Sequence, residues 1–393
     1  MSAATTPSFV HLHVHSEYSL VDSTVRIPEL VGGCAADGMP AVALTDRNNL
    51  FGIVKFYGKA MAAGVKPIVG ADVDVYDGDE PDRPHTLVLL CADNDGYRNL
   101  SRLLSRAYLE GQHRGQPMLR REWLDAESTR GLIALSGGLR GDVGQALANA
   151  HPDLAARRLD HWLGIFGDRY YLELIRTGRP GEEACVQATV ALATDHGVPV
   201  VATNDVRFAK TDGFYAHEAR VCIREGRSLG DSARPRPYSE QQYLKSAAEM
   251  ADRFADVPQA LANTVAIAQR CNLDLKLGTS VLPAFPVPPG ESEAGFLASE
   301  ANAGLERVLT AKFEAEDTPP PERPVTVSPM AALNRSLTNC CGSSCGAFWS
   351  DNSRVVTLAP TASAASPSDW PSSSPARRRV SMSSAAALRR SSI

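Results

Sequence analysis

Residues 9–22 read FVHLHVHSEYSLVD, and this stretch decides the expected fold and site. Side chains alternate between the two faces of a strand, so we expect His11, His13 and His15 to share one face and the apolar residues between them to share the other. An HxH pair can bind one metal ion, and Asp22 could add a carboxylate. The alternative is a strand whose histidines are hydrogen-bonded at a barrel mouth without metal, and the HxH pair alone does not distinguish the two.

Short β-rich runs alternate with helical patterns through the first two hundred residues, which is typical of βα units around a parallel sheet. Seven strands are predicted, at residues 9–15, 41–45, 67–71, 86–91, 132–136, 170–175 and 198–203. Helices are predicted at residues 28–37, 50–63, 97–110, 154–166, 180–196, 214–225, 240–254, 258–270 and about 293–313. The strand count allows either a closed barrel or an open doubly wound sheet.

Polar residues stand at the ends of several predicted strands. They are His13 and His15, Thr45 and Asp46, Gly70 and Asp72, Ser136 and Gly137, and Asn204 and Asp205. The carboxyl ends of parallel strands meet on one face of a βα barrel, whereas an open sheet gathers such residues only at a switch point. The distribution therefore favours a barrel. Asp72 and Asp205 add carboxylates near the HxH pair, and this favours an ancestral metal site over a strand without metal.

The composition is typical of a soluble globular protein, except in the last part of the chain. The 393 residues are 44% hydrophobic and 22% charged, with a net charge of −5. Residues 331–393 contain 16 Ser and 7 Arg against 2 Asp, without Glu or Lys, so this tail carries +5 and residues 1–330 carry −10. No apolar run is long enough to span a membrane and no secretory signal is evident, and the widely spaced cysteines predict reduced thiols in the cytoplasm.

Eight segments together resemble one known family. They are FVHLHVHSEYSLVDS, MPAVALTD, GVKPIVGAD, GYRNLSRLLSRAY, DRYYLELIRTGRP, VPVVATNDVRF, RPRPYSEQQYLKS and FADVPQALANTVAIAQRCN. They resemble the amino-terminal PHP (polymerase and histidinol phosphatase) domain of the bacterial DNA polymerase III alpha subunit, from about Phe9 to about Phe313. The resemblance implies a distorted seven-stranded (β/α) barrel. We expect the PHP domain at residues 1–280, a linker and the start of the polymerase region at 281–317, and a low-complexity tail, disordered or out of frame, at 318–393.

The resemblance also implies a set of metal ligands, since metal-binding members hold three zinc-like ions with nine side chains. Six matching positions could still bind a metal: His13, His15, Asp22, Asp72, His85 and Asp205. Three positions depart from the family's pattern, because Arg47 and Arg207 stand where it has histidines and Gly138 stands where it has a cysteine. The resemblance therefore implies a degenerate metal cluster.

The two arginines suggest what replaced the metal ions. A guanidinium stays protonated at physiological pH and has no lone pair to offer a metal. We therefore expect Arg47 and Arg207 to pair with the aspartates, which would leave the barrel folded but without hydrolase activity. The alternative is a residual zinc or manganese ion held by the HxH pair with Asp22 or Asp205.

The resemblance implies a part in DNA replication. The polymerase palm carries aspartates that bind two magnesium ions, and this sequence contains no such motif. We expect an amino-terminal fragment of the replicative DNA-directed DNA polymerase, a nucleotidyltransferase, whose PHP domain docks the proofreading exonuclease (epsilon) subunit within the polymerase III holoenzyme. The negative charge of residues 1–330 predicts contact with DNA only through the intact enzyme. The alternative is a metal-dependent phosphoesterase or 3'-5' exonuclease.

Three interpretations of the tail stay open. In the first interpretation, the tail is a basic disordered extension in which residues 377–379 bind phosphate. Alternatively, the cysteines of CCGSSC at 340–345 bind a metal, although their spacing fits no CxxC pair. The third interpretation is out-of-frame sequence from a high-GC gene, which the absence of Glu and Lys favours.

Overall fold

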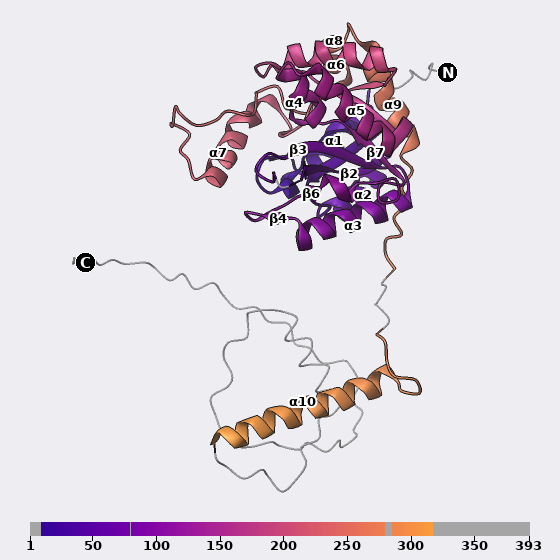
Figure 1. Cartoon of the computed structure of the whole chain (residues 1–393), viewed down its shortest axis with the longest axis vertical. Coiled ribbons are helices and arrows are strands. Elements are labelled where there is room, and N and C mark those ends of the chain that lie inside the picture. The colour runs from indigo at the N-terminus through magenta and orange to yellow at the C-terminus, as the bar shows by residue number, and fades with distance from the viewer. Residues whose placement is uncertain (1–8, 79, 280–284, 317–393) are drawn as a thin grey trace, which may run out of the picture. The chain divides into compact units, whose positions relative to one another are not determined.

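The computed structural model describes residues 9–78, 80–279 and 285–316. The main strands are β1 (Ala41–Arg47), β2 (Lys66–Tyr76), β3 (His85–Cys91), β7 (Leu132–Leu135), β8 (Tyr170–Ile175) and β9 (Val200–Thr203), and they are hydrogen-bonded in this order. The short β6 (Leu119–Arg120) pairs with β2, and β4 (Gln112–His113) pairs with β5 (Gln116–Pro117). Figure 1 shows the strands at the centre of this part of the chain, with helices around them.

Residues 9–15 close the sheet on itself. His11 forms a parallel bridge with Val42 of β1, and Val14 forms one with Val206, directly after β9. Backbone hydrogen bonds accompany both bridges. The segment therefore lies between β1 and β9, and the predicted seven-stranded barrel is confirmed.

One strand runs against the prediction of a parallel sheet. β3 pairs antiparallel with both β2 and β7, whereas β1, β2, β7, β8 and β9 share one direction. The reason is the short connection between Tyr76 and His85, because a parallel crossover needs about a dozen residues or more. The start of β3 therefore lies at the end of the barrel where the other strands finish.

The barrel has an inner and an outer apolar layer, and the first strand changes layer part-way. Leu12 packs with inner residues such as Ala43 and Val88, whereas Val14 packs in the outer layer with the helices. The predicted alternation through residues 10–14 is therefore wrong. A bend at residue 13 interrupts the strand, and the alternation breaks there.

His11 consequently lies apart from the other two histidines of the motif. Its Nε2 atom lies 2.8 Å from the carbonyl oxygen of Lys245, and its ring contacts Phe9 edge-on. The prediction that His11, His13 and His15 share one face is wrong for His11, because the bend separates it from the pair that follows.

Burial of His11 gives a testable pH dependence. Burial lowers its pKa from 6.5 to about 4, although the Lys245 carbonyl opposes this shift. Above about pH 6.5 the imidazole is neutral in both the folded and the unfolded chain; between pH 6.5 and 4 only the unfolded chain takes up the proton. We expect the free energy of unfolding to fall by about 3 kcal/mol as the pH falls through this window. Denaturant unfolding of the wild type and of His11→Gln checks this, because the variant should lack this contribution and parallel pH curves would contradict it.

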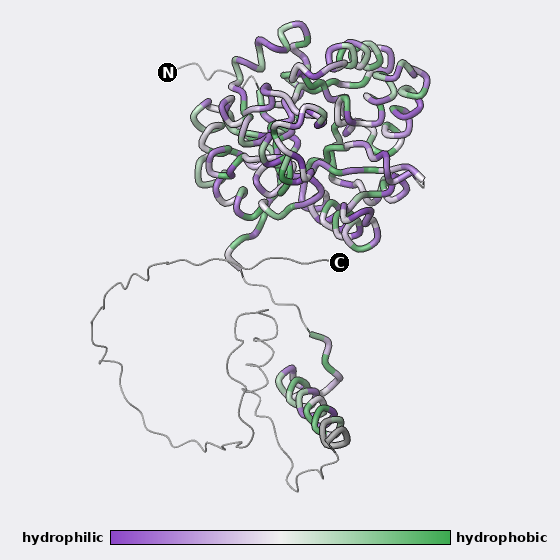
Figure 2. The backbone as a smooth tube through the Cα atoms, turned by 90° about the vertical axis from the view of Figure 1, so that its left-hand side faces the viewer, coloured by the Kyte–Doolittle hydropathy of each residue, from purple (hydrophilic) through white to green (hydrophobic). Residues whose placement is uncertain are grey.

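Most of the helices cover the outside of the barrel. The helices are α1 (Ile27–Ala36), α2 (Ile53–Ala62), α3 (Asn94–Glu110), α4 (Asp142–Ala148), α5 (Pro152–Phe166), α6 (Glu182–His196), α7 (Phe214–Glu225), α8 (Ala247–Arg253) and α9 (Pro258–Arg270). Figure 1 shows one of them, α7, to one side of the barrel. In Figure 2 hydrophobic and hydrophilic residues interchange along these helices. The sequence did not predict α4, which is only seven residues long. The helix predicted at residues 240–254 begins only at Ala247, because the preceding residues are extended and Tyr243 forms a β-bridge with Phe208.

The chain divides into two units at about residue 281. In the second unit the structure describes the helix α10 (Glu293–Glu316), where a helix was predicted. The tail predicted at 318–393 lies outside the described residues. None of the helices in the described ranges is both long and apolar enough to cross a membrane.

The turn after β7 requires a glycine. Gly137 has a φ of +77°, and a Cβ atom there would lie 2.3 Å from the carbonyl oxygen of Thr86. We expect Gly137→Ala to lower the free energy of unfolding by more than about 2 kcal/mol, since both the backbone conformation and the contact oppose a side chain. Gly164, exposed in α5 with open space at its Cβ position, is the matched control, and Gly164→Ala should raise stability by about 0.5–1 kcal/mol. Equal stability of the two variants in urea would contradict the placement of this turn.

Candidate functional site

Two histidines and two aspartates meet at the end of the barrel where most strands finish. His13 and His15 come from the first segment, Asp72 from β2, and Asp205 from the residues after β9, and all four are buried. The Nε2 atoms of the histidines lie 3.2 Å apart. Asp72 Oδ2 lies 3.6 Å from the first and 3.3 Å from the second, and Asp205 Oδ1 lies 3.7 and 3.5 Å from them.

Each imidazole is oriented by a partner at its other nitrogen. The Nδ1 atom of His13 lies 2.8 Å from Glu173 Oε1, and that of His15 lies 3.0 Å from the Ser19 hydroxyl. Burial opposes protonation of His13, but the Glu173 carboxylate raises its pKa to about 10. Burial, followed by the charge of Arg207, lowers the pKa of His15. The pair therefore combines one protonated and one neutral imidazole with both Nε2 atoms facing the centre.

Arg207 fills the centre of the cluster and is completely buried. Its Nη1 atom lies 2.7 Å from Asp22 Oδ2, its Nη2 atom lies 2.7 Å from Asp205 Oδ1, and its Nε donates to the same Asp205 oxygen at 2.7 Å. Burial alone would raise the pKa of both aspartates, but the guanidinium lowers the pKa of each well below its usual range. Nη2 also lies 3.9 Å from Asp72 Oδ2. One guanidinium therefore contacts three of the candidate metal ligands.

Arg47, at the end of β1, lies at the edge of the same cluster. Its Nε and Nη2 atoms donate to the two carboxylate oxygens of Asp74 at 2.9 and 3.0 Å, and its Nη1 lies 3.6 Å from Asp22 Oδ2. The Tyr238 hydroxyl donates to the same Asp22 oxygen at 3.1 Å. The sequence predicted a pairing of Arg47 with aspartates, but it did not identify Asp74 or Tyr238.

Comparison with known proteins identifies the domain that builds this cluster. Residues 11–177 match the family model of the PHP domain. This part of the chain is a PHP domain. The matched residues include the histidine pair, Asp22, Asp72 and Arg47. Arg207, which contacts Asp22, lies outside the matched residues.

Relatives extend the likeness beyond the PHP domain. The chain is 49% identical over 312 residues to the DNA polymerase III subunit alpha of Pseudomonas fluorescens, a match that covers 79% of this chain and 26% of the relative. It is also 49% identical over 318 residues to that of Escherichia coli (strain K12), covering 81% of this chain and 27% of the relative. The expected resemblance to DNA polymerase III alpha subunits is confirmed, and the chain spans about a quarter of the length of these relatives.

A solved structure gives a weaker likeness. An amidohydrolase from Chromobacterium violaceum covers 54% of this chain and 96% of its own, with 15% identity and a TM-score of 0.38. A likeness at this level bears on no residue of the site.

His85, one of the positions that the resemblance implied, lies outside the cluster. His85 is the first residue of β3 and pairs with Val75 of β2, which packs in the outer layer. Val88 of β3 pairs with Asp72 and packs in the inner layer. Because side chains alternate along a strand and His85 lies three residues from Val88, His85 faces the outer layer. There its Nε2 atom lies 4.0 Å from Asp142 Oδ2, and burial lowers its pKa to about 4. The structure thus brings together His13, His15, Asp22, Asp72 and Asp205, and it does not bring His85 to them.

Gly138 leaves little room for the cysteine that the family carries. Its φ is +54°, and a Cβ atom there would lie 2.8 Å from Ile175 Cδ1. A side chain at this position would therefore need both an unfavourable backbone conformation and a shift of Ile175.

Glu173 and Arg179 are further residues of the site that were not predicted from the sequence. Glu173 accepts hydrogen bonds from the Thr203 hydroxyl as well as contacting His13, and Arg179 Nη1 lies 3.6 Å from Asp205 Oδ2. The signal for Glu173 was a single charged residue inside the apolar run YYLELI of β8, because a buried carboxylate requires a partner. Arg179 lies in a loop and had no such signal.

The residues of the PHP domain fit one metal ion better than three. His13, His15 and Asp72 offer ligand atoms that all lie within 4.8 Å of one another, and Asp72 Oδ2 is buried without a hydrogen bond among the described residues. Arg207 Nη2, however, lies 3.9 Å from that oxygen. Like charges about 4 Å apart repel by about 4 kcal/mol per unit charge at an effective dielectric constant of about 20. The guanidinium therefore opposes a cation at this site.

Proposed function

We propose that this chain is the amino-terminal part of a replicative DNA polymerase, the DNA polymerase III alpha subunit, and that its PHP domain has a structural and docking role instead of a hydrolytic one. The likeness at 49% identity supports the first half of this proposal. The observation that carries the second half is the buried guanidinium of Arg207, which contacts Asp22, Asp72 and Asp205.

Charge balance supports the loss of the metal cluster. Each of the central aspartates has a cationic side chain beside it: Asp22 and Asp205 have Arg207 at 2.7 Å, and Asp72 has the protonated His13 at 3.6 Å. Buried carboxylates need such partners, and here the chain supplies them itself. The proposed degenerate cluster comprises His13, His15, Asp22, Asp72 and Asp205, with Arg47 and Arg207 beside them. Of the other positions that the resemblance implied, His85 lies apart from the cluster and Gly138 has no side chain.

Activity assays on the full 393-residue chain test this proposal. We expect no template-dependent primer extension with magnesium, because the palm aspartates are not found in the sequence. We also expect no release of phosphate from p-nitrophenyl phosphate and no 3'-5' excision with zinc or manganese. An active polymerase and an active exonuclease serve as positive controls. DNA synthesis by this chain would refute the proposal that only the intact polymerase synthesises DNA. Metal-dependent hydrolysis would refute the structural role of the PHP domain.

The proposed docking role concerns the proofreading exonuclease (epsilon) subunit, together with other subunits of the polymerase III holoenzyme. In this proposal the domain at residues 1–280 binds that subunit in the cytoplasm, the region from 281 begins the polymerase part, and DNA and magnesium are bound only by the intact enzyme. A pull-down of purified exonuclease subunit with the full chain tests the docking. Absence of binding at micromolar concentrations would refute it.

A metal-dependent phosphoesterase or 3'-5' exonuclease is the alternative, and one observation favours it. Asp72 Oδ2 is buried without a hydrogen bond beside both histidines. His13, His15 and Asp72 would hold one zinc or manganese ion, which when bound would activate a water molecule for attack on phosphorus. Glu173 and Ser19 would keep the two imidazoles oriented. The hydrolysis assay above distinguishes the two functions.

A further inference from the structure

A polar cleft, called here the β3 cleft, opens beside the start of β3. Its volume is about 500 Å³, and it lies between residues of the β2–β3 connection, the helix α4 and the first turns of α5. Among the described residues that line it, only Ala146 and Leu154 contribute apolar side chains. None of these lining residues takes part in the contacts of the histidine cluster, so the two sites are separate.

A buried imidazole without a partner lines the β3 cleft. His85 is 5% exposed, and its Nε2 atom has no hydrogen bond within the described part of the chain. Asp142 Oδ2, at 4.0 Å, is too far from this atom for one. Because buried polar groups are nearly always hydrogen-bonded to protein, water or a ligand, this imidazole calls for a partner from outside the chain.

Two guanidinium groups line the β3 cleft without a carboxylate partner. Arg158 of α5 donates from Nη1 to the backbone carbonyl of Asp142 at 2.6 Å. Arg83, just before β3, is exposed. Neither guanidinium forms an ion pair with any residue that the structure describes. Since a backbone carbonyl does not neutralise a guanidinium, both groups keep their positive charge and N–H donors for a ligand.

Two of the three carboxylates that line the β3 cleft already have partners outside it. Asp142 is buried, accepts hydrogen bonds from the Trp162 indole at 3.0 Å and pairs with Arg121. The same guanidinium lies 2.7 Å from Asp77 Oδ1. Glu80 is exposed and has no such partner among the described residues. The unpaired carboxylate therefore stands in the exposed part of the lining, whereas the buried part offers N–H donors.

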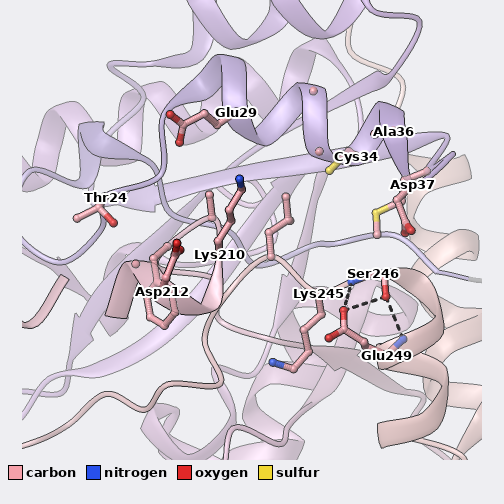
Figure 3. A pocket seen from close by; sticks show the side chains of 17 residues that line it. Thr24, Glu29, Cys34, Ala36, Asp37, Lys210, Asp212, Lys245, Ser246 and Glu249 are labelled. Carbon is pink, nitrogen blue, oxygen red and sulfur yellow. Dashed lines mark hydrogen bonds between the residues drawn. The ribbon is translucent and has the colours of Figure 1, made fainter. Parts of the chain in front are cut away.

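A larger groove in the same unit lacks this property. Figure 3 shows it between α1, the loop 208–213 and residues 244–249, with a volume of about 860 Å³. The side chains of Ser246 and Glu249 bond each other there, and Asp37 accepts a hydrogen bond from a backbone amide. These polar groups are therefore already satisfied within the chain, in contrast to His85 in the β3 cleft.

We propose that the β3 cleft binds the phosphate group of a small, hydrophilic phosphate monoester. Arg83 and Arg158 supply charged donors for the phosphate oxygens, and a guanidinium can bind phosphate through two parallel hydrogen bonds. A volume of about 500 Å³ is typical of small-molecule sites, and the polar walls fit a ligand with hydroxyl groups. This inference goes beyond the proposed function, because it involves neither the polymerase activity nor the metal cluster.

Calorimetric titration of the full chain tests the proposal, with inorganic phosphate and ribose 5-phosphate as probes. We expect ribose 5-phosphate to bind with a Kd of about 1 mM or below, and inorganic phosphate at least about threefold more weakly. In Arg158→Gln the Kd for ribose 5-phosphate should rise at least about tenfold, because the charged donor is lost. Arg157→Gln is the matched control, since Arg157 is exposed on the same helix and does not line the cleft.

Two substitutions in the exposed part of the lining test the charge of the ligand. Arg83→Gln should weaken the binding of ribose 5-phosphate by about three- to tenfold, and Glu80→Gln should strengthen it by about two- to threefold. Both effects should shrink at high salt, because both positions are exposed. Opposite signs of this kind identify an anion, whereas the reverse signs would overturn the proposal.

The remaining outcomes are equally decisive. No saturable binding of either probe up to about 10 mM would overturn the proposal. Equal binding by the wild type and Arg158→Gln would place the anion elsewhere on the chain, and equal affinity for the two probes would assign the cleft to free phosphate instead of a monoester. If circular dichroism shows that Arg158→Gln does not fold, Arg83→Gln decides, since this exposed side chain has no partner to lose among the described residues.

Discussion

Replacing Arg207 with alanine is expected to lower the free energy of unfolding by about 3–5 kcal/mol. The guanidinium is completely buried and lies 2.7 Å from oxygens of both Asp22 and Asp205. Without it, the two carboxylates stay buried and keep only the more distant guanidinium groups of Arg47 and Arg179, each 3.6 Å away. Removal of one partner from a buried ion pair leaves much of the desolvation cost uncompensated. Urea unfolding monitored by circular dichroism measures the change.

Arg98→Ala is the control for this experiment. Arg98 pairs with Asp95 on the surface of α3, where both side chains are largely exposed, and such pairs contribute about 1 kcal/mol or less. A loss of stability below about 1 kcal/mol in Arg207→Ala would contradict the central place given to this arginine.

Returning histidine to both arginine positions is expected to create metal binding. In Arg47→His with Arg207→His, the charge that opposes a cation disappears and two imidazoles join His13, His15 and the aspartates. We expect the variant to bind zinc, and at a zinc concentration 100 times its Kd the free energy of unfolding should rise by about 2.7 kcal/mol. Thermal unfolding with and without zinc measures this, and the wild type should show no comparable shift.

Replacement of the same two residues by leucine is the matched control. It removes the two positive charges without adding ligands, so it separates the effect of lost repulsion from the effect of gained imidazoles. Equal zinc responses of the wild type and the histidine variant would show that the arginines do not decide metal binding.

The sequence predicted the barrel because its strands are local patterns. Seven β-rich runs separated by helical spacing correspond to the seven segments of the closed sheet. Of the polar residues predicted at their ends, His13, His15, Asp72 and Asp205 lie in the cluster. The sequence also predicted that Arg207 pairs with aspartates, because a guanidinium stays protonated and has no lone pair for a metal, and the structure places it 2.7 Å from oxygens of Asp22 and Asp205. These predictions depend on residue type and spacing alone.

Other features depend on contacts that spacing does not encode. The antiparallel β3 follows from the length of one connection, and the register of that strand turns His85 to the outer layer. The bend at residue 13 separates His11 from the other histidines. Glu173 reaches His13 across 160 residues of sequence, so only the closed barrel reveals the pair. Chain direction, register and long-range pairs therefore required the structure.

We propose that arginine–carboxylate pairs have taken the place of the metal ions. The most direct test is the metal content of the full chain, purified without chelator and measured by inductively coupled plasma mass spectrometry after dialysis. We expect zinc and manganese each below about 0.1 equivalents per chain, because the guanidinium of Arg207 lies 3.9 Å from Asp72 Oδ2 and opposes a cation there. Retention of about one equivalent or more of either metal would contradict it.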